Sequence, residues 1–191
     1  MARHPLMNSE QQRLWERIKS FRFDEGEAAF PFVSRLARDN GWSSAYAVRA
    51  ITEYRKFVFL AIAAGHPVTP SDQVDQVWHL HLLYTRSYWE RFCRETLGRP
   101  LHHEPTKGGK SEKDKFGRWY AATIESYRRY FGEEPPADVW PEANTRFGED
   151  IHFERVNRKR FWVVPKRWAK TGATGALLAG VALIWVFFSC L

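Results

Sequence analysis

Residues 74–93 read VDQVWHLHLLYTRSYWERFC, and this stretch decides the fold because it joins helical periodicity to many aromatic side chains. Apolar or aromatic residues recur in it every three to four positions, which is typical of one buried helix face. The expected members of this face are Val74, Val77, Trp78 and His81. The pattern predicts a helix that packs against other helices.

Residues that start and stop helices surround this stretch. Thr69 fits the N-cap and Pro70 the first helical position. A short break is expected around residues 84–87, and Gly98 fits the end of the helix that follows. The sequence therefore predicts two consecutive helices between residues 70 and 97.

The rest of the chain carries the same helical signals. An S-x-x-Q capping box at residues 9–12 opens a first helix. Further helices are predicted over residues 31–40, 43–64 and 111–131. No segment alternates in the manner of a strand. We expect an all-α fold, in which a soluble helical domain over residues 1–150 is followed by a single C-terminal transmembrane helix.

The C-terminal segment predicts a membrane anchor. Residues 172–191 read GATGALLAGVALIWVFFSCL and contain no charge. At about 1.5 Å per residue, a helix of this length spans roughly 30 Å, the thickness of a bilayer's hydrocarbon core. A buried C-terminal helix is the alternative, but few soluble helices lack a polar face over this length. The expected partner of this segment is therefore the lipid bilayer.

A basic linker over residues 151–171 precedes this span. The chain's net charge of +7 comes from seven residues in it, because the remaining 22 Lys and Arg equal the acids in number. The cluster favours a cytoplasmic N-terminal domain and contact with anionic headgroups. Binding to nucleic acid would also account for the basic cluster, but the adjacent span explains it more simply. The seven residues are Arg155, Arg158, Lys159, Arg160, Lys166, Arg167 and Lys170.

Imidazole and thiol side chains form a candidate metal site. A turn at residues 85–87 would bring Cys93 to the height of His79, and the next loop returns His103. The candidate ligands are His79, His81, Cys93 and His103, and zinc is the ion that such donors suit. Asp75, four residues before His79, is expected to orient that imidazole from behind the metal.

A core interpretation of the same residues remains open. Successive helical residues turn by about 100°, so His79 and His81 point roughly 200° apart and cannot both reach one ion from a regular helix. In this alternative His81 is hydrogen-bonded inside the core. Cys93 is then a small buried apolar residue.

The stretch resembles the D-x-x-W-H-x-H…Y…C signature of the glycine-rich domain-containing protein-like family, in its bacterial membrane-anchored type. HHEPTKGG, at residues 102–109, and FGEEPPADVWP, at residues 131–141, are similar to bacterial members. The resemblance covers roughly residues 45–142 and implies no particular reaction. It places the signature on Asp75, Trp78, His79, His81, Tyr88, Cys93 and His103. No glycine-rich segment is present, and the chain could be a short form of a longer protein.

Two functions follow from these observations. The first is a membrane-anchored cytoplasmic binding or scaffold module with a protein partner. The second is a zinc-dependent enzyme that uses the His and Cys cluster of residues 75–103. The sequence names no substrate for either, and metal analysis of the protein distinguishes them.

Overall fold

The computed structural model describes residues 7–104, 110–152, 156, 160–164 and 166. It divides the chain into one unit of residues 1–152 and a second of residues 153–191. No helix within the described ranges is both long and apolar enough to cross a membrane. The predicted span at residues 172–191 lies outside these ranges.

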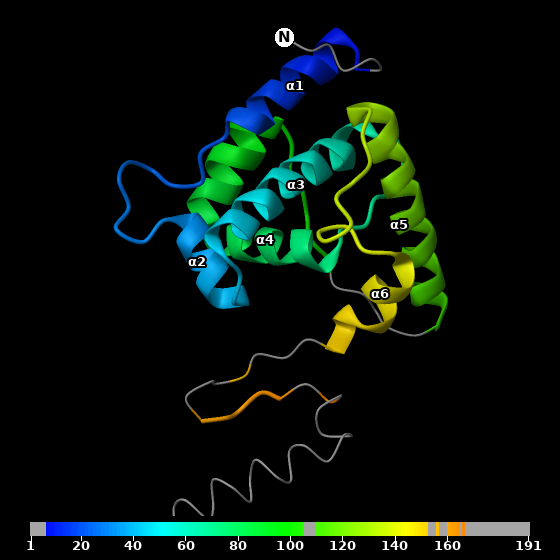
Figure 1. The fold of residues 1–191 in the computed structure, drawn as a ribbon. Helices are drawn as coiled ribbons and strands as arrows, with labels where there is room; N and C mark the ends of the chain where they lie inside the picture. The colour runs from blue at the N-terminus through cyan, green and yellow to red at the C-terminus, as the bar shows by residue number, and fades with distance from the viewer. Residues whose placement is uncertain (1–6, 105–109, 153–155, 157–159, 165, 167–191) are drawn as a thin grey trace, which may run out of the picture. The chain divides into compact units, whose positions relative to one another are not determined.

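The first unit contains helices and no strand in its described residues, which confirms the predicted all-α class (Figure 1). The elements are α1 (Ser9–Ser20), α2 (Phe32–Asn40), α3 (Ser44–Ala63), α4 (Asp72–Leu83), η1 (Arg86–Leu97), α5 (Lys110–Phe131), α6 (Ala143–Gly148) and the short turn η2 (Asp150–His152).

Helix α3 lies at the centre of this unit and packs against α1, α2, α4 and α5 (Figure 1). Its buried residues include Ala50, Tyr54, Val58 and Leu60, all fully shielded from solvent. A helix that is apolar around most of its circumference must be covered on several sides. The sequence of α3 therefore places the other helices around it.

The predicted ends of α2 and α3 are confirmed. Gly41 follows α2 with φ of 68°, a left-handed conformation that glycine adopts without steric cost. The Ser43 side chain accepts a hydrogen bond from Tyr46 N and caps α3.

Two predicted helix starts need correction. Helix α1 is capped by Asn8, whose side chain forms a reciprocal capping box with Gln11, one residue earlier than the predicted pair. Helix α4 is capped by Ser71, whose hydroxyl accepts from Val74 N. Thr69 is not the cap, because it lies two residues before Ser71 and its side-chain oxygen accepts no hydrogen bond from α4. Its backbone N–H donates to the hydroxyl of Thr123 on α5.

The second helix of the 74–93 stretch is wider than predicted. The break occurs at Tyr84, and η1 is a π-helix, a class in which N–H groups bond to carbonyls five residues earlier. Its buried side chains recur every four to five positions, as this wider turn requires. They are Tyr88, Phe92, Cys93 and Leu97, with Ser87 near the start of the helix.

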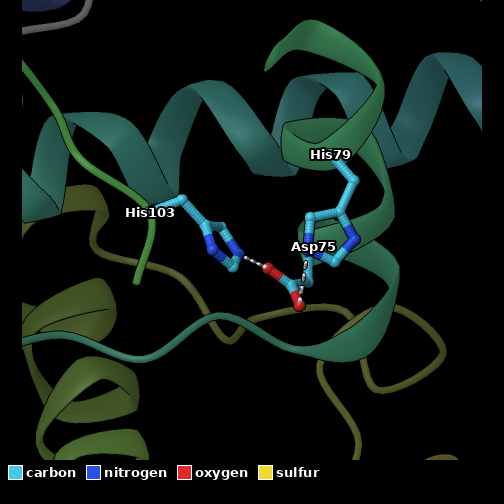
Figure 2. A group of neighbouring side chains, drawn as sticks. All are labelled: Asp75, His79 and His103. Atoms are coloured by element: carbon cyan, nitrogen blue, oxygen red, sulfur yellow. Dashed lines mark hydrogen bonds and ion pairs between the residues drawn. The ribbon is translucent and has the colours of Figure 1, made fainter. Parts of the chain in front are cut away.

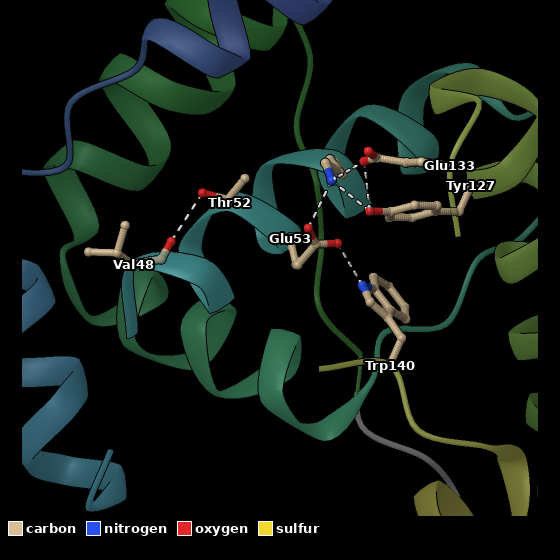
Figure 3. A network of polar contacts seen from close by, with 7 residues as sticks. Val48, Thr52, Glu53, Tyr127, Glu133 and Trp140 are labelled. Carbon is tan, nitrogen blue, oxygen red and sulfur yellow. Dashed lines mark hydrogen bonds and ion pairs between the residues drawn. The ribbon is translucent and has the colours of Figure 1, made fainter. Parts of the chain in front are cut away.

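A buried polar network joins α3 to the segment that follows α5 (Figure 3). The carboxylate of Glu53 accepts from Trp140 Nε1 at 2.9 Å and from Lys56 Nζ at 2.9 Å. Lys56 Nζ also donates to Tyr127 Oη at 2.6 Å and Glu133 Oε1 at 2.7 Å. Each buried charge in the network therefore has an opposite charge beside it, which limits the cost of removing it from water.

Candidate metal site

Helix α4 presents Asp75 and His79 on one face, in consecutive turns. Residues four apart on a helix are neighbours on its surface. The Asp75 carboxylate is mostly buried, whereas 49% of the His79 side chain is exposed. The helix thus fixes one carboxylate and one imidazole side by side at the edge of the solvent.

The segment after η1 brings His103 to the same place. Tyr88 on η1 holds this segment, because its hydroxyl donates to Leu101 O and accepts from Trp78 Nε1 at 2.8 Å. The indole of Trp78 then packs edge-on against the His103 ring, with centroids 4.5 Å apart. Trp78 and Tyr88 therefore position His103 against α4, although neither is itself a metal ligand.

The Asp75 carboxylate lies between the two imidazoles (Figure 2). His103 Nε2 donates to Asp75 Oδ1 at 2.7 Å, and His79 Nε2 lies 3.7 Å from Asp75 Oδ2. One donor atom from each residue lies within 4.8 Å of the other two. Two imidazole nitrogens and a carboxylate oxygen thus converge on a space the size of one ion.

The electrostatics of the group favour positive charge. The hydrogen bond from His103 to Asp75 is the main reason that the pKa of His103 is raised, against a smaller opposing effect of burial. The carboxylate therefore favours the protonated form of His103. A divalent cation at this place would take over that role from the proton.

His81 lies elsewhere, inside the aromatic core. Its Nδ1 lies 3.0 Å from Tyr54 Oη and its Nε2 3.4 Å from Ser87 Oγ. Burial is the main cause that lowers the pKa of His81 to about 3, with Arg91 adding to it. Both ring nitrogens are engaged and the imidazole is neutral, so His81 does not join the group of Asp75, His79 and His103.

Cys93 is also outside this group. It is buried on η1, where it meets the Tyr88 hydroxyl and the backbone of Leu101. Burial raises the pKa of its thiol, so the thiol is kept protonated. Of the predicted ligands, the structure therefore brings together His79 and His103. Asp75, predicted to stand behind them, lies directly between them.

The sequence analysis does not identify two contributions to this site. The first is the carboxylate of Asp75 as a direct donor, for which the spacing of four residues to His79 is the signal. The second is the pair Trp78 and Tyr88, whose hydrogen bond joins α4 to η1. His102, next to His103, stacks instead near Trp89, with centroids 5.5 Å apart.

The predicted membrane-facing residues belong to the second unit. Of the seven basic residues, only Arg160 and Lys166 are within the described part of the chain, and both are exposed. Between them lies an exposed apolar run, in which Trp162 is 97% exposed. Its members are Phe161, Trp162, Val163 and Val164.

Comparison with known proteins identifies the family. A family model described as UCP032817-like matches residues 15–123, more than half of the chain and all three residues of the candidate site, and the chain belongs to this family. Glycine-rich domain-containing protein 2 of Arabidopsis thaliana is 22% identical over 107 residues, which are 53% of this chain and 14% of that protein. Glycine-rich domain-containing protein 1 of the same plant is 23% identical over 107 residues, 53% of this chain and 13% of that protein. The expected similarity to glycine-rich domain-containing proteins is thereby confirmed over a small part of their length. No solved structure matches the chain.

Proposed function

We propose that this member of the UCP032817-like family is a metal-binding module, which holds one divalent transition-metal ion through Asp75, His79 and His103. The observation that carries the proposal is the convergence of three donors within 4.8 Å, two from α4 and one from the segment after η1. Segments distant in sequence are brought together at these donors by Trp78 and Tyr88.

The donor set favours zinc or a similar ion. Imidazole nitrogen and carboxylate oxygen are common zinc ligands, and three protein ligands leave a fourth position open in a tetrahedral site. The exposure of His79 gives this position access to solvent. A bound ion would lower the pKa of a water molecule there, which is the chemistry that the enzyme interpretation requires.

Metal content tests this proposal. The full-length protein, purified without a chelator or a histidine tag and equilibrated with zinc, should carry one ion per chain by mass spectrometry of the metal. Asp75→Asn, His79→Ala and His103→Ala should each lower the content, because each removes a ligand. His102→Ala is the matched control, since His102 adjoins the site but packs near Trp89. A wild-type protein without stoichiometric metal would refute the proposal.

We also propose that residues 172–191 anchor the domain in a membrane, with the domain on the cytoplasmic side, as in the bacterial membrane-anchored type. The charge-free length of this segment supports the anchor. The exposed apolar side chains at residues 161–164, flanked by Arg160 and Lys166, support contact with the lipid interface.

Fractionation tests the anchor. Deletion of residues 169–191 should move the protein from the membrane fraction to the soluble fraction. High salt is needed in the wash, because basic residues bind anionic lipid without spanning it. Truncated protein that still pellets with membranes at high salt would contradict the anchor. A reporter at the N-terminus should be protected from external protease, and its digestion in intact cells would contradict the orientation.

A further inference from the structure

A second candidate site lies in a groove between α2, α3 and the loop that connects α1 to α2. The groove has a volume of about 620 Å³, which is within the usual range for small-molecule sites. Most of its lining is apolar. The apolar residues include Phe23, Pro31, Phe32, Val33, Val48 and Ile51.

The loop that forms one wall is held at its base. The backbone carbonyls of three consecutive residues, 21–23, accept hydrogen bonds from Arg55, Arg91 and Ser87 respectively. At the other end, both oxygens of Asp24 accept from Phe32 N at 3.0 Å. Because these contacts fix the loop at both ends, the groove is formed before any ligand arrives, which lowers the cost of binding.

Arg55 supplies a positive charge to this apolar groove. Its Nη2 donates to Phe21 O at 2.7 Å, and its guanidinium lies 5.3 Å from the centroid of the Phe23 ring. Among the described residues it forms no ion pair, and its Nε has no hydrogen-bond acceptor. Burial lowers the pKa of the Arg55 guanidinium, because removal from water disfavours its charged form.

The acids of the lining do not provide a counter-charge for Arg55. Asp24 uses both carboxylate oxygens to cap the backbone of Phe32. Glu27 is exposed at the rim of the groove. Arg55 is partly buried, so its charge carries some desolvation cost without an anionic partner, and a ligand that brings the anion reduces this cost.

We propose that this groove binds a small organic carboxylate with an apolar body, whose carboxylate pairs with Arg55. The planar guanidinium matches the two oxygens of a carboxylate. The aromatic and aliphatic walls then receive the apolar body. This binding site is independent of the metal site and of the membrane anchor.

The test compares two probes of nearly equal shape, phenylbutyrate and the uncharged phenylbutanol. Binding to the full chain in lipid nanodiscs is measured by equilibrium dialysis, with empty nanodiscs subtracted. The wild-type protein should bind the carboxylate about tenfold more tightly than the alcohol, as expected for a hydrogen bond to a charged group. Equal binding of the two probes, or no binding of either, overturns the proposal.

Three variants locate the binding. Arg55→Gln should remove the preference for the carboxylate, whereas Arg22→Gln, which removes an exposed cation from the same lining, should preserve it. Val48→Trp places a large side chain at the half-exposed wall of the groove and should weaken both probes. If Arg55→Gln fails to fold, the wild-type preference and Val48→Trp decide the matter. A folded Arg55→Gln that keeps the preference, or a Val48→Trp that binds both probes normally, refutes the proposal.

Discussion

His79 and His81 stand two residues apart on α4, yet they lie in opposite environments. Half of the His79 side chain is exposed, beside Asp75 and 4.7 Å from the His103 ring by centroids. His81 is fully buried, between the hydroxyls of Tyr54 and Ser87. The same imidazole is therefore a candidate ligand at one position and part of the core at the other.

This comparison shows that the position on the helix, rather than the residue type, decides the role. A turn of about 200° between the two residues sends one ring to the solvent edge and the other to the helix interface. The aromatic rings around His81 disfavour its charged form, whereas a carboxylate beside His103 favours charge there. The variants and conditions below test whether His79 and His81 differ in this way.

The largest expected effect is on stability. His81→Ala should lower the free energy of unfolding by about 3–5 kcal/mol, because it leaves a cavity among aromatic rings and the buried Tyr54 hydroxyl without its partner. His79→Ala, in metal-free protein, should change it by less than about 0.5 kcal/mol, as is usual at exposed positions. Denaturant titration of both variants in the presence of a chelator measures the difference. Similar losses in the two variants would contradict the comparison.

Metal binding should also distinguish the site of His79 from the core position of His81. Zinc at about a hundred times its dissociation constant should stabilise the wild-type protein by about 2.7 kcal/mol, because the folded state alone presents the three ligands together. His103→Ala should lose this gain. Thermal melts with zinc and with a chelator measure it, and His102→Ala serves as the control. A gain that persists in His103→Ala would place the metal elsewhere.

The buried histidine should also impose a dependence on pH. Because the pKa of His81 is lowered from 6.5 to about 3 in the folded protein, the unfolded chain binds the proton more readily between these values. The stability is thus fully present above the unfolded pKa and is lost as pH falls towards the folded one. Between pH 6.5 and about pH 5 the loss should reach about 2 kcal/mol.

His81→Phe isolates this contribution, since phenylalanine keeps an aromatic ring but does not titrate. The pH dependence of wild-type protein minus that of the variant, both metal-free, should show the loss. His103 acts in the opposite direction, because its raised pKa gives stability that is lost as pH rises. It is present in both proteins and cancels in the difference. Parallel pH curves for the two proteins would refute the assignment.

Much of the fold could be predicted because its signals are local. Gly41 and Ser43 mark helix ends by conformational preference and by side-chain capping, and neither depends on distant residues. The cap of α4 is different. The sequence predicts Thr69 there, whereas Ser71 caps the helix and Thr69 is tied through its backbone N–H to Thr123 on α5. A single sequence shows no such contact.

The candidate site divides in the same way. The pairing of Asp75 with His79 follows from helical spacing, and it was visible before the structure. The placement of His103 depends on Tyr88, whose hydroxyl bonds to Trp78 Nε1 and to Leu101 O. Both contacts join residues of different segments, so the site could not be completed from helical periodicity alone.

The smallest expected effect concerns Cys93, the remaining residue of the predicted ligand set. Its thiol is buried, and burial raises its pKa, so the thiolate that a metal requires is disfavoured. Cys93→Ala should leave the metal content at the wild-type level, while removal of a small buried side chain lowers the free energy of unfolding by about 1 kcal/mol. Metal analysis and denaturant titration of the same preparation separate these outcomes. A loss of metal as large as that of His103→Ala would return Cys93 to the ligand set and show that η1 moves when an ion binds.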